Sequence, residues 1–170
     1  IAGFGNGVDA FGLGGYEVGH PPTKHNQAFD RVRAAGLPSL PHAGETEGPA
    51  SIWGAVRRLG AQRIGHGVRC LEDSRLVDEL RSRQIPLDSL AEHPLPHLIA
   101  EGLYVTINSD DPPLFNTTLS DEYVLCAQAF NFDAAQMEHL SLNALRASLL
   151  PPARRQALER RFLRDFARLR

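Results

Sequence analysis

Short apolar stretches alternate with longer amphipathic stretches along the first two thirds of the chain. The apolar stretches lie at 8–11, around Leu40, and at 63–67, 85–87 and 104–107. Such short runs, rich in Val, Ile and Leu, are typical of buried strands. We therefore expect about five strands.

The amphipathic stretches predict helices between these strands. In 28–36, for example, Phe29, Val32 and Ala35 share one face. The other helices are expected from an N-cap at Ser51 to Gly60, from Asp73 or Ser74 onward, at 94–101, and beyond Asp121, with the last at 152–170. Strands separated by helices form βαβ units, so the sequence predicts an α/β fold with a parallel sheet. In such folds, functional residues gather at the carboxyl ends of the strands.

Composition and charge narrow the class of protein. The chain has 170 residues, 42% of them hydrophobic, and a net charge of −2. This balance is typical of a globular domain and argues against nucleic acid as the main partner. Cys70 and Cys126 are the two cysteines, too few for a disulfide framework, so a cytoplasmic location is the default expectation.

The sequence gives no indication of a membrane span or a signal peptide. No apolar run approaches the ~20 residues that a spanning helix needs, and the first residues lack a basic region followed by a long apolar core. In the last helix Leu158, Phe162 and Phe166 form one stripe. We expect this stripe to pack on the domain rather than on a membrane.

Candidate chemistry lies at the predicted strand ends. In "HAGE", the His42 imidazole and the Glu45 carboxylate are separated by two small residues that leave room for a ligand; a surface turn with a helix cap is the alternative. In "GHG", two glycines flank His66. They suggest close approach by a ligand or by another side chain, whereas a lone histidine is more often a satisfied core residue.

Two adjacent carboxylates, Asp110 and Asp111, end the last predicted strand in "TINSDDPPLF". Turn chemistry explains such residues in many proteins. A metal ion bound by one aspartate would relieve their repulsion, and together with His42 and His66 these residues suggest a metal site. A catalytic zinc usually has three protein ligands and one open position.

Other candidate motifs are weaker. "GLGG" at 12–15 fails as a dinucleotide-binding fingerprint, because Glu17 stands where the third glycine is required. It can still form a turn whose backbone N–H groups reach a ligand. The remaining histidines are expected at the surface: His20, His25, His93, His97 and His139.

Taken together, the motifs "HAGE", "RIGHG" and "NSDDP" resemble those of the adenosine deaminase family. The stretch "GPASIWGAVRRLGAQRIGHGVRCLED", and "TLSDEY" and "NALRASLLPP" after the third motif, extend the resemblance over almost the whole chain. The resemblance implies a metal-dependent (β/α)8 TIM barrel that hydrolyses the 6-amino group of a purine and releases ammonia. The H-x-E and P-C-x-x-C signature of the cytidine-type zinc deaminases is absent from the sequence.

The resemblance also implies a role for each matching residue. His42 and Asp110 would be ligands of one Zn²⁺ ion. Glu45 would be protonated and would donate its proton to purine N1, and His66 would orient or deprotonate the metal-bound water. Asp111 would interact with purine N7, and Gly15 would offer its backbone N–H to N3.

The chain departs from the family in two respects. It contains no His-x-His pair, which the family carries on its first barrel strand, and after "IPL" it lacks a segment such as "CPTSN". A (β/α)8 barrel takes at least ~200 residues. We therefore interpret 1–170 as a single domain, the C-terminal half of a barrel plus C-terminal helices, without the N-terminal strands and a segment near 87–89.

The leading hypothesis is a zinc-dependent purine deaminase. Its substrate would be a small purine, and the choice among adenosine, adenine and 6-aminodeoxyfutalosine is left open. The sequence also leaves open whether the protein forms a homo-oligomer. No nucleic acid or membrane partner is expected. One alternative is an inactive fragment or binding domain that lacks the His-x-His pair. Another is a different metal hydrolase on the same barrel, against which Glu45 beside His42 argues.

Overall fold

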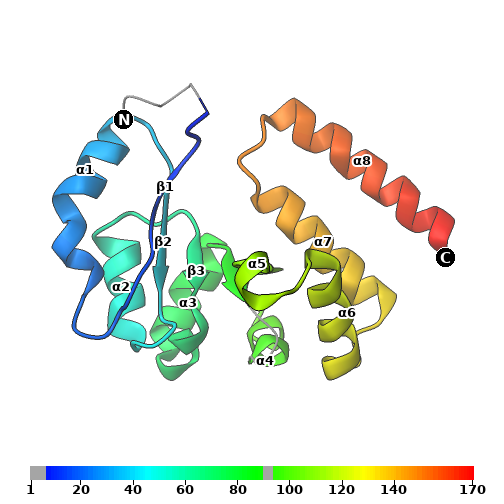
Figure 1. Cartoon of the computed structure of the whole chain (residues 1–170), viewed down its shortest axis with the longest axis horizontal. Coiled ribbons are helices and arrows are strands. Elements are labelled where there is room, and N and C mark those ends of the chain that lie inside the picture. The colour runs from blue at the N-terminus through cyan, green and yellow to red at the C-terminus, as the bar shows by residue number, and fades with distance from the viewer. Residues whose placement is uncertain (1–6, 90–93) are drawn as a thin grey trace. The chain divides into compact units, whose positions relative to one another are not determined.

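The computed structural model describes residues 7–89 and 94–170 (Figure 1). The described residues form two compact units, which meet in sequence between Tyr104 and Val105. The first unit contains β1 (Phe11–Leu13), the 3-10 helix η1 (Pro22–His25), α1 (Asn26–Ala34), β2 (Ser39–Ala43), α2 (Pro49–Arg57), β3 (Ile64–His66), the 3-10 helix η2 (Val68–Glu72), α3 (Ser74–Arg83), β4 (Leu87–Ser89) and α4 (Leu95–Ala100). The second contains β5 (Val105–Ile107), α5 (Pro112–Phe115), α6 (Leu119–Phe130), α7 (Ala134–Ala147) and α8 (Pro152–Leu169).

The strands of the first unit pair in parallel and in chain order. Phe11 lies opposite Ser39, His42 opposite Gly65, and Ile64 opposite Leu87. This arrangement confirms the predicted βαβ units. Because the strands are parallel, the loops that follow β1, β2 and β3 leave the same edge of the sheet.

Helices of the first unit cover this sheet with apolar side chains. Ile52 and Leu59 come from the α2 segment, Leu76 and Leu80 from α3, and each of these side chains is fully buried. Helix α2 contacts β2, and Figure 1 shows α1 and α2 beside the first two strands. The buried helix faces hold the strands in place, and so fix the loops at their carboxyl ends.

The second unit is built around β5 and α7. All three residues of β5 are buried, and α7 packs directly against the strand. The buried Asn143 side chain donates a hydrogen bond of 3.1 Å from Nδ2 to the Val105 carbonyl oxygen. This bond ties α7 to the strand that leads to Asp110 and Asp111.

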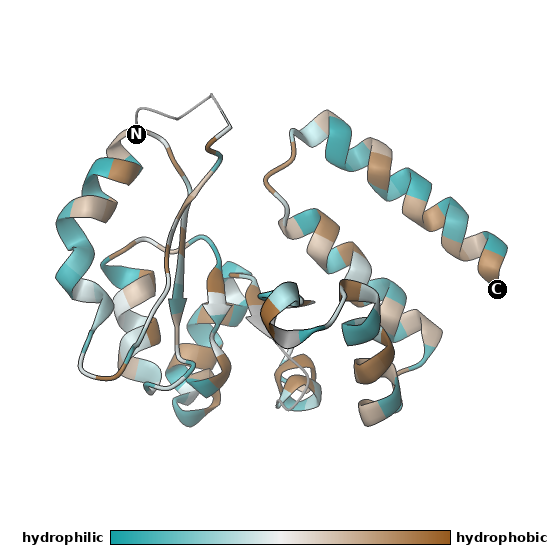
Figure 2. Ribbon diagram, in the orientation of Figure 1, coloured by the Kyte–Doolittle hydropathy of each residue, from teal (hydrophilic) through white to brown (hydrophobic). Residues whose placement is uncertain are grey.

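Helix α8 packs on α7 through one side, as its sequence pattern predicted. Figure 2 shows hydrophobic and hydrophilic residues interleaved along this helix, and Phe162 and Phe166 pack edge to face with ring centroids 5.9 Å apart. Arg146 of α7 also pairs with Glu159 of α8 at 2.6 Å. Within the described residues no helix is long and apolar enough to cross a membrane.

Several local predictions need correction. Ser51 does not cap α2, because Gly48 is the N-cap and Ser51 is buried in the first turn. Pro49 occupies N1 instead, where its fixed φ suits a helix start. The first strand is Phe11–Leu13 rather than 8–11, and α6 begins at Leu119 after a capping box at Thr118.

Other predictions agree with the described structure. Asp73 caps α3 through its side chain, and both cysteines are free and buried. His20, His25, His97 and His139 are exposed, whereas His93 lies outside the described residues. The strand expected at 85–87 is present but shifted, because β4 is Leu87–Ser89. Two expectations stay predictions. One is that 1–170 is a single domain, and the other is that a family segment near 87–89 is absent from the chain.

Candidate active site

A cavity of about 300 Å³ opens at the carboxyl edge of the first unit's sheet. Gly14 and Gly15, which follow β1, form part of its wall, and His42 and Glu45 form another part. The prediction that "GLGG" and "HAGE" lie at one strand edge is therefore confirmed for these residues. Tyr16, His20 and His25 also line the cavity, so two of the histidines expected at the surface are exposed and face the same hollow.

The His42 side chain is seated against Gly65 of the neighbouring strand. The two residues are opposite each other in the β2–β3 pairing. A Cβ atom built on Gly65 would lie 2.4 Å from Cδ2 of His42, closer than side chains tolerate. Because Gly65, the first glycine of "GHG", has no side chain, the His42 ring fits against it. The sequence suggested close approach by a ligand or by another side chain, and the structure shows a side chain at this glycine.

His66 stands beside His42 and Glu45. The imidazole rings of His42 and His66 meet edge to face, with centroids 4.9 Å apart. Nε2 of His66 lies 3.4 Å from Oε2 of Glu45, a contact that becomes an ion pair when the imidazole is protonated. His66 has a φ of 67°, which is uncommon outside glycine. Such a conformation at the end of a strand is typical of residues held for a function.

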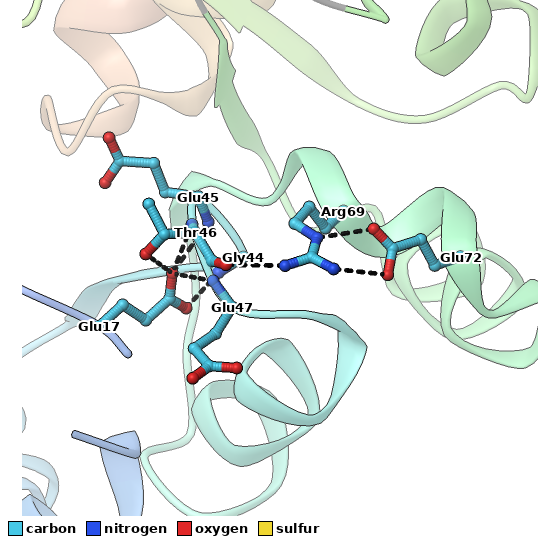
Figure 3. Close-up of polar contacts among 7 residues, drawn as sticks. All are labelled: Glu17, Gly44, Glu45, Thr46, Glu47, Arg69 and Glu72. Carbon is cyan, nitrogen blue, oxygen red and sulfur yellow. Dashed lines mark hydrogen bonds and ion pairs between the residues drawn. The ribbon is translucent and has the colours of Figure 1, made fainter. Parts of the chain in front are cut away.

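The loop 44–47 that carries Glu45 is held by the Glu17 carboxylate (Figure 3). Oε1 of Glu17 accepts the N–H of Gly44 at 2.6 Å, and Oε2 accepts those of Glu45, Thr46 and Glu47 at 3.1, 2.9 and 2.9 Å. Burial alone would raise the pKa of Glu17, but the backbone N–H groups, together with the neighbouring Ser51 hydroxyl, stabilise the carboxylate and lower its pKa from 4.5 to about 2. Glu17 is therefore ionised at neutral pH.

The other side of this loop is tied to η2. Nη1 of Arg69 donates to the Thr46 carbonyl oxygen at 2.7 Å. Arg69 also forms two hydrogen bonds with Glu72, at 2.6 and 3.1 Å, and this pairing lowers the pKa of Glu72. Gly44 turns the chain at a φ of 75°, and a Cβ there would collide with Ile52 of α2 at 2.4 Å. The loop is thus fixed by hydrogen bonds on both sides and by packing beneath it.

Asp110 and Asp111 belong to the second unit. Both are exposed, and Asp110 adopts a φ of 50°. Asp111 occupies the N-cap position of α5, but its side chain makes no capping hydrogen bond. Turn chemistry therefore accounts for the backbone at this point, while the Asp111 carboxylate is not used to start the helix.

The predicted site residues thus fall into two groups. Gly15, His42, Glu45 and His66 gather in the first unit, and the two aspartates end β5 in the second. Within residues 7–89 and 94–170, no three His, Cys, Asp or Glu side chains are grouped as a metal site. The imidazole of His42 and the carboxylate of Asp110 are nonetheless ligand types that zinc prefers.

The sequence does not indicate the role of Glu17, which stands out there only as the side chain that breaks a glycine fingerprint. The carboxylate reaches backbone groups 27 to 30 positions away in the chain. Since backbone N–H groups are present in every loop, their convergence on Glu17 leaves no trace in residue types, and only the folded path of the chain shows it.

The fold and the place of this site are those of a part of a (β/α)8 barrel. A family model described as adenosine deaminase matches residues 4–163. The chain therefore belongs to the adenosine deaminase family, as its motifs indicated.

Individual relatives agree with this assignment. The chain is 42% identical over 160 residues to an aminodeoxyfutalosine deaminase of Streptomyces avermitilis, covering 86% of this chain and 45% of that protein. It is 36% identical over 165 residues to an adenosine deaminase of Yersinia pseudotuberculosis, covering 89% and 49%. The chain spans about half the length of the curated relatives that it matches.

Solved structures give the same result for the fold. An adenine deaminase from Arthrobacter aurescens superposes with a TM-score of 0.87 at 34% identity, over 92% of this chain and 52% of that one. An amidohydrolase from Burkholderia ambifaria, solved with bound zinc, superposes with a TM-score of 0.88 at 24% identity, over 93% and 48%. The predicted fold class is confirmed, with the chain corresponding to about half of each barrel protein.

Proposed function

We propose that the protein to which this chain belongs hydrolytically deaminates a 6-aminopurine nucleoside or base. One observation carries the proposal: in a member of the adenosine deaminase family, His42, Glu45 and Gly15 line one cavity while His66 contacts Glu45. The names of relatives support three substrates, namely adenosine, adenine and aminodeoxyfutalosine. A carboxyl group and an imidazole in contact can together provide the proton transfers that amine displacement needs.

The proposal includes one zinc ion, with His42 and Asp110 as two of its ligands. Their imidazole and carboxylate groups suit zinc, which usually takes three protein ligands in a catalytic site. Bound zinc would lower the pKa of a water molecule toward ~7 and so make a nucleophile available at neutral pH. His42, which lines the cavity, would be the ligand supplied by the first unit.

Glu45 and His66 would move the protons. As water adds at C6 of the purine, the Glu45 carboxyl donates a proton to N1 and His66 accepts a proton from the water. The C6–N bond then breaks, the proton from His66 leaves with ammonia, and the remaining hydroxyl proton returns to Glu45. A 6-oxopurine is the product. The Glu45 side chain is 54% exposed in this structure, so it is accessible to a purine ring bound in the cavity that it lines.

Gly15 and Asp111 would orient the ring. Gly15 has a φ of 137° and lies on the cavity wall, where its backbone N–H could meet N3. Asp111 would read N7, for which it must share a proton, because a bare carboxylate would repel the N7 lone pair. The Asp111 side chain is exposed and makes no capping hydrogen bond to α5, which is compatible with this role.

The test is ammonia release by the full-length gene product supplied with zinc. Adenosine, adenine and 6-aminodeoxyfutalosine are the substrates, and cytidine is the negative control. We expect release from at least one purine, about one zinc per chain, and a loss of at least ~10²-fold in Glu45→Gln. Glu47→Gln, which changes the same charge two residues away, should retain activity.

Absence of ammonia from all three purines at full zinc content would overturn the proposal. A purified protein that neither binds zinc nor releases ammonia would instead indicate a binding domain. Release from cytidine at a comparable rate would also contradict the proposed role of Glu45, because a proton delivered to purine N1 suits purines specifically.

A further inference from the structure

We propose that Glu17 is the positioning residue of this site, and that its carboxylate sets the place of Glu45 by binding the backbone of loop 44–47. The catalytic consequence rests on the function proposed above. Glu17 follows β1 and the loop follows β2, so this carboxylate joins two neighbouring strand ends. Glu17 also lies in the cavity wall, but in the proposed role its carboxylate acts through Glu45.

The hydrogen bonds are numerous for a single side chain. Four successive backbone N–H groups, from Gly44 to Glu47, donate to the two Glu17 oxygens at 2.6 to 3.1 Å. The Thr46 hydroxyl lies 3.4 Å from Oε2 as a further donor. Hydrogen bonds to an ionised acceptor are roughly twice as strong as neutral ones. Successive N–H groups that converge on one anion also fix the φ and ψ angles of every residue between them.

These hydrogen bonds set the direction in which the Glu45 side chain points. Its own N–H is bound to Oε2 of Glu17, and Figure 3 shows its side chain directed away from the Glu17 carboxylate. On that side, its carboxylate reaches to 3.4 Å from Nε2 of His66. The backbone of Glu45 is thus held on one side of the loop so that the carboxylate is presented on the other.

A second contact joins the same two segments. Oε1 of Glu47 accepts the N–H of Gly19 at 3.3 Å, so the turn that carries Glu17 is also bound by the loop it holds. The exposed Glu47 contact uses one oxygen and one donor, in contrast to the four donors on Glu17. Glu47→Gln keeps an acceptor oxygen and removes one charge, which makes it the matched control for Glu17→Gln.

The purely structural alternative is that Glu17 only stabilises the first unit. Kinetics and hydrogen exchange separate the two roles. In Glu17→Gln one oxygen becomes an NH₂ group that cannot accept. We expect kcat to fall roughly 10- to 100-fold, as for other residues that orient catalytic groups, with KM within about twofold and zinc content unchanged. Peptides covering 44–47 should exchange their amide hydrogens at least about tenfold faster. Glu47→Gln should match the wild type in both measurements.

A double-mutant cycle tests whether Glu17 acts through Glu45. If it does, Glu17→Gln should reduce kcat no further once Glu45→Gln is present, because the positioned carboxyl is already gone. An equal loss in both backgrounds would overturn the proposal, and so would unchanged exchange in 44–47. If the wild type releases no ammonia from any purine, the proposed function fails, while the exchange experiment still decides whether Glu17 holds the loop.

Discussion

Gly65→Ala is the sharpest perturbation that the structure offers. Gly65 is buried in β3 and its φ lies in the ordinary negative range, so alanine causes no backbone strain there. Its new Cβ atom would lie 2.4, 2.8 and 2.9 Å from Cδ2, Cγ and Nε2 of His42. All three distances are shorter than real Cβ contacts, so the imidazole ring must move.

The size of the effect follows from this overlap. Real Cβ contacts essentially never fall below 3.0 Å, so Cδ2 must retreat by at least about 0.6 Å, or the ring must rotate. Either movement changes the edge-to-face contact between the His42 and His66 rings. Inserting a methyl group into such packing costs about 1–3 kcal/mol, and misplacing a functional group by ~1 Å can cost about 10²-fold in rate. We expect a lower free energy of unfolding, lower zinc occupancy and a 10- to 100-fold loss of kcat/KM.

Gly54→Ala is the matched control. Gly54 lies inside α2, and a Cβ there would meet Thr23 and Pro22 at 3.7 to 3.8 Å, which is ordinary contact. Removing a helical glycine should stabilise the protein by up to ~1 kcal/mol. Unfolding in urea, zinc content and ammonia release are measured on both full-length variants. A Gly65→Ala protein with wild-type stability, zinc content and activity would refute the seating of His42 against Gly65.

The other predictions concern the remaining site residues. His42→Ala and Asp110→Ala should each lower zinc content and activity together, and full zinc in Asp110→Ala would remove it from the ligand set. His66→Ala should keep zinc but lose about 10²–10⁴-fold in kcat; near-normal kcat would make it a packing residue. Asp111→Ala should keep zinc, lose activity on adenosine and lose little more on 7-deazaadenosine, whereas equal losses on both would show that it does not read N7. Because the pKa of Glu17 is lowered to about 2 in the folded protein, its carboxylate stabilises the fold above pH ~4.5, and this contribution is lost as the pH falls toward 2. The carboxylate is partly exposed, so the advantage of wild type over Glu17→Gln in urea unfolding should be only ~1 kcal/mol at pH 6 and smaller at pH 3.

Local patterns were sufficient to predict much of the first unit. The apolar runs around Leu40 and Ile64 became β2 and β3, and the stripe through Leu76 and Leu80 became the buried face of α3. These features depend on side chains a few positions apart, which is the range over which hydrophobic periodicity carries information. The place of the site followed from them, because parallel strands bring their carboxyl ends to one edge.

Helix starts were predicted less well for a physical reason. Ser51 is a good N-cap residue by type, but Pro49 already fits N1, and Gly48 supplies the extended conformation before it. Both Pro49 and Ser51 are compatible with a helix start by residue type, and Ile52 in the same helix is fully buried. Residue preferences of ~1 kcal/mol are easily outweighed by the burial of such a side chain.

The sequence does not predict long-range polar contacts such as those of Glu17. It does indicate part of one long-range packing contact. The glycines of "GHG" indicated close approach without naming the atoms that approach. The structure supplies the missing fact, which is the register: His42 stands opposite Gly65, so the histidine of one motif occupies the space that the glycine of the other leaves open. The two motifs are therefore coupled through strand pairing. A larger residue at 65 is expected to act on the chemistry of His42 although it changes no ionisable group.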